Sequence, residues 1–281
     1  MKPTMHKDYH THTFRCHHAQ GEVRDYAAAA VEKGLQVLGV TDHTPFPSPL
    51  PNEQWNQVRM SLSQLDSYEE AIVEAREEFP TLTILKGMEC EFIPDFLPFY
   101  REELLGRRRF DYLIAGNHVF LCQGQWRSAH SQIKTGEELL AYAEHVIKAM
   151  ASGLFAFIAH PDLFGNSYEL WDEHTIRCSE LILEAAAAYR IPLEINGYGL
   201  RKPLKETAAG ARPPYPLSPF WELAATVKGL TVVANSDAHQ PADVGATAEV
   251  EKMIERYGLH RADLSLLERS AKQSLSAPPG R

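Results

Sequence analysis

The sequence contains few cysteines, no long apolar run and no excess of positive charge. Four cysteines are spread over 281 residues without a C-x-x-C pair, which argues against a disulfide framework and favours a reducing cytoplasm. No apolar run reaches the roughly 20 residues needed to cross a bilayer, and Met1–Lys7 lacks the apolar core of a signal peptide. The net charge of −9 disfavours a nucleic-acid-binding surface. We therefore expect a cytoplasmic protein with no membrane or nucleic-acid partner.

Solenoid-type repeats are also absent, and strand and helix patterns alternate along the chain. With 44% hydrophobic residues, a chain of this length can bury a large core. Predicted strands with nearly continuous apolar residues lie at 7–10, 36–40, 82–85, 112–115, 154–159, 193–195 and 231–234. Such strands are typical of a parallel sheet that is buried on both faces. The prediction is an α/β fold, a distorted seven-stranded (β/α)7 TIM-like barrel that forms a single domain over 1–270, followed by a flexible tail over 271–281.

Helices are predicted between these strands, because apolar residues recur there at helical spacing. Thr135 and Glu138 fit a capping box at the start of one helix. Ser218-Pro219 fits the N-cap and first position of another. The predicted helices lie near 23–31, 65–79, 96–107, 135–150, 176–189, 218–228 and 244–257.

Metal-binding residue types follow six of the seven predicted strands. They are His10 and His12, then His43, Glu89, His118, His160, and finally Asp237 with His239. Side chains two residues apart on a strand point the same way, so His10 and His12 would face one ion. A single histidine after a strand is usually an ordinary loop residue, but a parallel barrel gathers all of its strand ends at one face. One geometry therefore explains all six coincidences, and we predict a convergent metal site.

Several neighbouring residues leave alternatives open. Glu91 competes with Glu89 as a ligand, and Glu89 is preferred because it lies nearer the strand end. His18 lies in the first loop, where it could close over the site. Three aspartates adjoin predicted ligands and would either orient imidazoles, as carboxylates often do behind a metal, or cap turns. They are Asp8, Asp42 and Asp162.

The set of motifs D-Y-H-T-H-T, C-H-H-A, T-D-H, G-M-E, G-N-H, A-H-P-D and N-S-D-A-H resembles the PHP family, named for polymerase and histidinol phosphatase. The stretch 196–203 is most similar to the monofunctional histidinol-phosphatases. The resemblance implies a barrel with three divalent metal ions, which the family takes as zinc, manganese or iron. It assigns one ion to His10, His12, Glu89 and Asp237, a second to Glu89, His118 and His160, and a third to His18, His43 and His239. His17 competes with His18, which the family spacing favours.

This resemblance implies a phosphoric monoester hydrolase that acts on L-histidinol phosphate in histidine biosynthesis. Paired cations turn a bridging water into hydroxide near neutral pH and neutralise the phosphoryl oxygens. Arg201 is the candidate phosphate clamp, with Arg15 as a weaker one. Tyr198 is a candidate substrate contact, and Asp162 or a site histidine would protonate the departing oxygen. We expect a small phosphate ester as substrate, and phosphate or sulfate as ions that fit the site.

Two other functions and several details stay open. The chain could act on another small phosphate ester or nucleotide, or serve as a non-catalytic module stabilised by metal. The loops at 45–51 and 124–133 carry no recognisable specificity code. Neither the identity of the metal nor the oligomeric state follows from the sequence.

Overall fold

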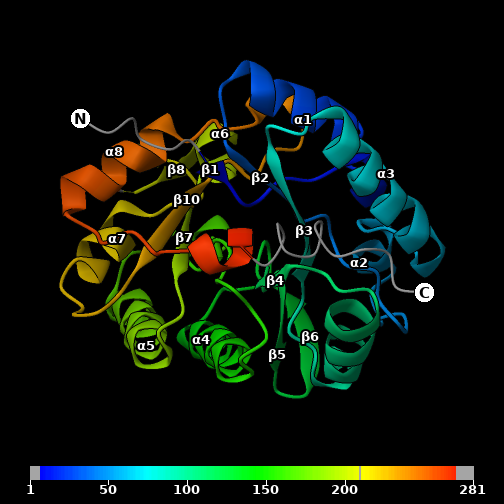
Figure 1. Ribbon diagram of the computed structural model, residues 1–281. Coiled ribbons are helices and arrows are strands. Elements are labelled where there is room, and N and C mark those ends of the chain that lie inside the picture. Colours follow the sequence, from blue (N-terminus) through cyan, green and yellow to red (C-terminus); the bar gives the residue numbers. More distant parts are fainter. Residues whose placement is uncertain (1–6, 209, 270–281) are drawn as a thin grey trace.

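The centre of the protein is a curled sheet of parallel strands, which the computed structural model places inside a ring of helices (Figure 1). The structure describes residues 7–208 and 210–269. Four strands pair in chain order: β1 (Lys7–Asp8), β2 (Val37–Val40), β3 (Thr83–Cys90) and β4 (Tyr112–Ala115). A second parallel pair consists of β7 (Leu193–Asn196) and β10 (Val232–Asn235). The predicted α/β class with a parallel sheet is confirmed.

The two groups of strands are joined by short backbone contacts. Ile158 forms parallel bridges to Ala115 on one side and to Leu193 on the other. Thr11 bridges to Ala238, and the backbone N–H of His12 donates to the Ala238 carbonyl at 2.9 Å. The strand predicted at 154–159 is therefore not regular, because it pairs by bridges at Ile158 only, and the left-handed backbone of His160 (φ 30°) ends its extended run.

α-Helices surround the sheet (Figure 1). They include α1 (Val23–Glu32), α3 (Leu65–Glu78), α4 (Gly136–Ala151), α5 (Glu173–Tyr189), α7 (Ser218–Ala224) and α8 (Ala248–Tyr257). The predicted capping box of α4 is present, since the side chains of Thr135 and Glu138 cap each other's backbone N–H groups. The start of α7 differs from the prediction, because its N-cap is Leu217. The Leu217 N–H donates to the Asp162 carboxylate at 2.6 Å, so a distant side chain supplies the cap.

Short helical turns occupy most of the connections. They are η1 (Phe14–Cys16), α2 (Glu53–Gln57), η2 (Leu62–Gln64), η3 (Pro94–Phe96), η5 (Leu163–Asn166), α6 (Tyr198–Arg201) and η6 (Pro241–Asp243). The helix predicted over 96–107 divides into η3 and the π-helical η4 (Phe99–Arg107). Most of these turns follow strand ends and therefore lie near the candidate site.

Two antiparallel hairpins were not predicted. One joins β5 (Val119–Cys122) to β6 (Gln125–Ser128), and the other joins β8 (Lys205–Thr207) to β9 (Gly210–Arg212). The turn of the first hairpin is Gln123-Gly124, and both residues have positive φ values, of 50° and 75°. Two such residues suit a tight turn between twisted strands. The second strand of this hairpin, β6, lies within the loop at 124–133 that carried no specificity code.

The core lies between the helices and the sheet and contains large buried side chains such as Trp221, Tyr26 and Phe120. None of the described helices is long and apolar enough to span a membrane. The predicted tail at 271–281 lies outside the described residues, and the domain limits 1–270 stay a prediction.

Candidate metal centre and active site

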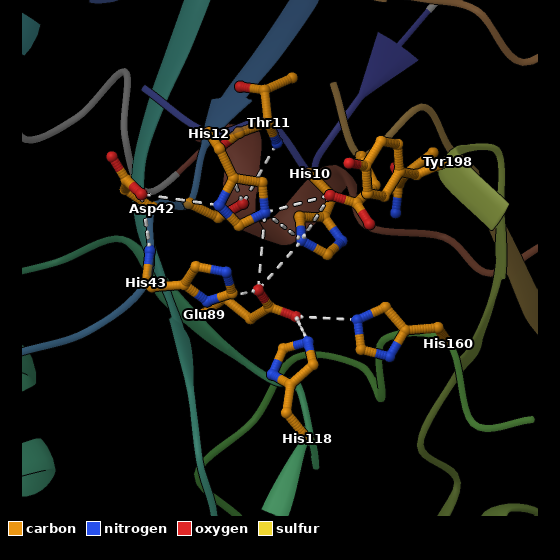
Figure 2. Close-up of polar contacts among 12 residues, drawn as sticks. His10, Thr11, His12, Asp42, His43, Glu89, His118, His160 and Tyr198 are labelled. Carbon is orange, nitrogen blue, oxygen red and sulfur yellow. Dashed lines mark hydrogen bonds and ion pairs between the residues drawn. The ribbon is translucent and has the colours of Figure 1, made fainter. Parts of the chain in front are cut away.

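The residues predicted to bind metal come together at the carboxyl ends of the parallel strands. Figure 2 shows Glu89, from β3, surrounded by histidines that come from separate segments. The buried members are nearly free of solvent contact: His10, His12, His43, Glu89, His160 and Asp237 are each at most 7% exposed. Burying so many titratable groups away from water is costly unless something pairs with them. The cluster therefore has the character of a ligand set.

His10, His12 and Asp237 each offer one atom of a compact candidate metal site, and Glu89 lies beside its two histidines. His10 Nε2 lies 3.0 Å from His12 Nε2, 3.5 Å from Glu89 Oε2 and 3.6 Å from Asp237 Oδ1. His12 Nε2 lies 3.5 Å from Glu89 Oε2 and 3.1 Å from Asp237 Oδ1. A tetrahedral zinc ion with bonds of about 2.0–2.1 Å separates its ligand atoms by about 3.3 Å. Both carboxylate oxygens are also buried without a hydrogen-bond partner, so the residues fit a cation.

Glu89 also reaches a second group of histidines. Its Oε1 atom lies 3.0 Å from His160 Nε2 and 3.7 Å from His118 Nε2. Its Oε2 atom lies 3.0 Å from His43 Nδ1. The two oxygens of one carboxylate therefore face different histidines, which is the arrangement that a bridging ligand needs (Figure 2).

The third group lies at the outer edge of the cluster. His18 Nε2 is 3.2 Å from His239 Nε2, and the His18 and His43 rings stack with centroids 5.2 Å apart. His17 instead contacts the Gln57 carbonyl through Nδ1 at 2.6 Å and is exposed. The geometry thus favours His18 over His17. The groups interlock, however, because His43 and His239 also lie within ligand range of His12.

Two glutamates orient the imidazoles from behind. Glu194 Oε1 lies 2.8 Å from His10 Nδ1, and Glu91 Oε1 lies 2.8 Å from His118 Nδ1. Burial alone would raise the pKa of each carboxyl, but the facing histidine lowers it below the usual value. Glu91, the sequence's alternative ligand to Glu89, thus lies behind His118, whereas Glu194 was missed. Its signal was a single acidic residue within the apolar strand L-E-I-N.

The aspartates predicted to orient imidazoles have different partners. Asp8 accepts hydrogen bonds from the Ser236 hydroxyl, the Ser236 N–H at 3.0 Å and the Gly245 N–H at 2.9 Å. It therefore anchors the segment after β10. Asp42 accepts from the Thr13 hydroxyl and from the His43 N–H at 2.8 Å. Its contact to His12 Nδ1, at 3.6 Å, is longer than a hydrogen bond.

Three residues at the strand ends have left-handed backbones. They are Asn117, His160 and Asp237, with φ values of 51°, 30° and 49°. This conformation costs a non-glycine residue about 1–2 kcal/mol. Asp237 is supported by Asn196, whose amide donates to its carboxylate at 3.0 Å. The strain falls on two predicted ligands and on the neighbour of a third, as expected where ligand placement outweighs backbone preference.

A cavity of about 340 Å³ opens onto the cluster. Besides the histidines and acids described above, its walls contain Gln54, Trp55, Val58, Arg59, Val119, Ser128, His130, Tyr198, Lys202 and Tyr215. Tyr198 stacks on His239 with ring centroids 4.4 Å apart. Tyr198 thus lines the cavity, and its role as a substrate contact stays a prediction. The hairpin residue Ser128 and the loop residue His130 also line the cavity without having been predicted.

Three predicted catalytic or substrate-binding residues do not line this cavity. The Arg201 guanidinium donates to the Ser236 carbonyl at 2.8 Å and faces Asp243 at 3.2 Å. Arg15 forms a two-pronged ion pair with Glu22, the shorter contact being 2.5 Å. Neither arginine lines the cavity. Arg201 Nη1 is nevertheless buried without a hydrogen-bond partner, so the role of these arginines at the phosphate stays a prediction.

Asp162 is the third residue that the structure turns away from the cavity. It accepts hydrogen bonds from the Leu217 N–H and, at 3.1 Å, from the Trp221 indole. Burial raises the pKa of its carboxyl to about 7, a suitable value for a proton donor. The carboxylate nevertheless packs beneath α7, so a role as proton donor lacks a path to the substrate.

Comparison with known proteins agrees with this geometry. The PHP domain model matches residues 8–197, a range that includes most of the clustered residues. The chain belongs to the PHP family.

Two curated relatives match most of the chain. A "Probable histidinol-phosphatase" of Deinococcus radiodurans is 34% identical over 248 residues, which cover 85% of this chain and 88% of the relative. A "Probable phosphatase" of Shewanella loihica is 27% identical over 277 residues, which cover 93% of this chain and 91% of the relative.

Among solved structures, the fold is similar to the histidinol phosphate phosphatase of Lactococcus lactis, a structure that contains zinc, L-histidinol and phosphate. The TM-score is 0.67 at 20% identity, and the match covers 92% of this chain and 95% of that one. At this identity the similarity shows the fold: an α/β domain of the PHP type.

Proposed function

We propose that this protein is a metal-dependent phosphatase that hydrolyses L-histidinol phosphate to L-histidinol and inorganic phosphate. The observation that carries the proposal is the buried pair of His10 and His12, whose Nε2 atoms lie 3.0 Å apart and each 3.1–3.6 Å from carboxylate oxygens of Glu89 and Asp237. The identity of 34% to a "Probable histidinol-phosphatase" supports the choice of substrate. The proposed reaction is the hydrolysis of a phosphoric monoester.

The proposed ligand sets are those that the resemblance implies. One ion would be held by His10, His12, Glu89 and Asp237, a second by Glu89, His118 and His160, and a third by His18, His43 and His239. When bound, divalent ions would supply positive charge that stabilises the phosphoryl oxygens. The same charge would lower the pKa of water at the site, so that hydroxide is available to attack near neutral pH. Imidazole suits zinc or iron, and carboxylate also admits manganese, so these three metals are the candidates.

The protein itself contributes orientation and exclusion of water. Glu194 and Glu91 hold the rings of His10 and His118 so that Nε2 of each faces the centre of the cluster. Burial of the cluster lowers the local dielectric constant and strengthens every charge interaction within it. Tyr198 forms a flat wall beside His239, on which an aromatic leaving group such as imidazole can stack. A histidine of the site is the remaining candidate for the proton donor, since Asp162 packs beneath α7.

A screen of phosphate monoesters tests the proposal against its alternatives. The protein would be loaded in turn with zinc, manganese or iron, and phosphate release would be measured from L-histidinol phosphate, sugar phosphates and nucleotides. Release confined to L-histidinol phosphate is the expected result. A broad or nucleotide-centred profile would indicate another PHP phosphoesterase. No release with any metal would indicate a non-catalytic module and would reject the proposal.

We further propose that the parallel strands form one closed, distorted seven-stranded barrel over 1–270. The bridges of Ile158 to both neighbouring strands, and of Thr11 to Ala238, support this closure. We also propose a cytoplasmic location, supported by four cysteines that are all buried and free.

A further inference from the structure

Two cationic side chains line the cavity, and one of them is already paired. Among the described residues of the wall these are Arg59 and Lys202. Arg59 Nη2 lies 3.6 Å from Glu91 Oε1, while its other nitrogens donate to the Thr44 carbonyl at 3.0 Å and the Trp55 carbonyl at 2.6 Å. Its charge and its hydrogen-bond donors are therefore largely used within the protein.

Lys202 is different, because its ammonium group has no hydrogen bond or ion pair within 7–208 and 210–269. Its Nζ atom lies 4.6 Å from the ring centroid of Tyr198 and 5.5 Å from that of Tyr215. Aromatic faces attract a cation but leave its N–H donors free. Partial burial lowers the pKa of Lys202, and nearby Asp237 opposes this effect. An anion that enters the cavity would therefore stabilise the charged ammonium group of Lys202.

The two tyrosines place this ammonium group above the predicted metal ligands. Tyr198 stacks on His239 at 4.4 Å, and the Tyr215 ring lies 5.8 Å from the His160 ring. Figure 2 shows Tyr198 at the edge of the cluster, on the side of His10 and His160. Lys202 thus faces the space between ligands assigned to different ions, which is where a phosphoryl group must lie to contact more than one of them.

We propose that Lys202 binds the phosphoryl group of the substrate, the role that the sequence suggested for its neighbour Arg201. The inference rests on the proposed phosphatase function. A lysine acts as a point charge with rotatable donors, which suits a phosphate whose other oxygens face metal ions. The end of α6 explains why Lys202, and not Arg201, faces the cavity. The helix ends at Arg201, whose guanidinium donates to the backbone that follows β10. The next residue, Lys202, lines the cavity.

The test compares K202M, K202R and the control K228M, which removes an exposed lysine charge outside the cavity. Each protein would be loaded with metal, its metal content measured, and its affinity for inorganic phosphate determined by calorimetry. The kcat and KM for L-histidinol phosphate would be measured in parallel. We expect K202M to bind phosphate about 10- to 100-fold more weakly, the usual effect of losing a charge-assisted hydrogen bond, and to raise KM more than it lowers kcat. K202R should recover part of the affinity, and K228M should match the parent.

The outcomes separate the inference from the proposed function. If K202M and the parent bind phosphate equally, or if the parent binds none, the role of Lys202 is wrong, whatever the turnover. If K202M weakens phosphate binding but the parent hydrolyses no ester, Lys202 is supported as a phosphate ligand and the phosphatase proposal fails. Should K202M lose metal, K202Q replaces it, because glutamine retains a polar group without charge. Normal phosphate binding by metal-loaded K202Q would then overturn the inference.

Discussion

The sharpest consequence of the geometry concerns Glu89, whose two oxygens face different histidines. Replacing Glu89 by glutamine keeps the shape of the side chain and removes its charge. At an effective dielectric constant of about 20, one unit charge acting on another at 4 Å contributes about 4 kcal/mol. That corresponds to about a thousandfold in affinity. We therefore expect Glu89→Gln to lose metal from the two positions that share this carboxylate and to lose turnover.

Metal analysis after dialysis, together with thermal unfolding, measures this effect. The metal-free variant should retain the circular dichroism of the parent, because glutamine fills the same volume, while the rise in Tm on adding metal should be much smaller. Glu222→Gln is the matched control, since Glu222 is exposed on α7. A Glu89→Gln protein with full metal content and full activity would refute the bridging role.

Three further predictions follow from the other contacts. Glu194→Gln removes the carboxylate behind His10 and should weaken metal binding about 10- to 100-fold; chelator competition measures this, and an unchanged affinity would contradict the orienting role. Arg201→Ala should lower the free energy of unfolding by about 1–3 kcal/mol through loss of its hydrogen bond to the Ser236 carbonyl, and its KM should be nearly unchanged. A large rise in KM with normal stability would instead support Arg201 as the phosphate ligand. Removing bound metal with a chelator should lower Tm by roughly 10 °C and abolish phosphate release, and an unchanged Tm would show that the cluster binds no stabilising ion.

The sequence was most informative where local chemistry and position agree. Glu89 lies near the end of a strand that was predicted at 82–85 but extends to Cys90, and His10 and His12 follow β1. A parallel sheet brings such positions to one edge whatever the details of the connections. Errors of a few residues in strand length therefore left the predicted cluster intact. The irregular segment around Ile158 still delivers His160, because bridges to both neighbours position it.

Prediction was poorest for residues whose role depends on side-chain direction. Arg201 and Lys202 are adjacent, and the order of residues does not reveal which of them turns toward the cavity. Asp162 follows a predicted strand and lies next to a predicted ligand, as an active-site acid would. It nevertheless caps α7, accepting from Leu217, which is 55 residues further along the chain. The hairpin of β5 and β6 was missed because the Q-W-R-S sequence of β6 has neither an apolar run nor a buried face, so it lacks the pattern that predicts a strand.

By itself, the sequence determined which segments become buried strands and which ligand types follow them, because apolar runs and histidine or acidic side chains are properties of short stretches. Only the tertiary structure decided how these ligands share a centre, that Glu194 supports His10, and that Lys202 carries the free charge in the cavity wall. Those facts depend on distances between segments that are far apart in the chain, such as Asp8 and Gly245, which are 237 residues apart. Such distances arise when the chain packs, because hydrogen bonds and burial select one side-chain direction among several that the local sequence allows.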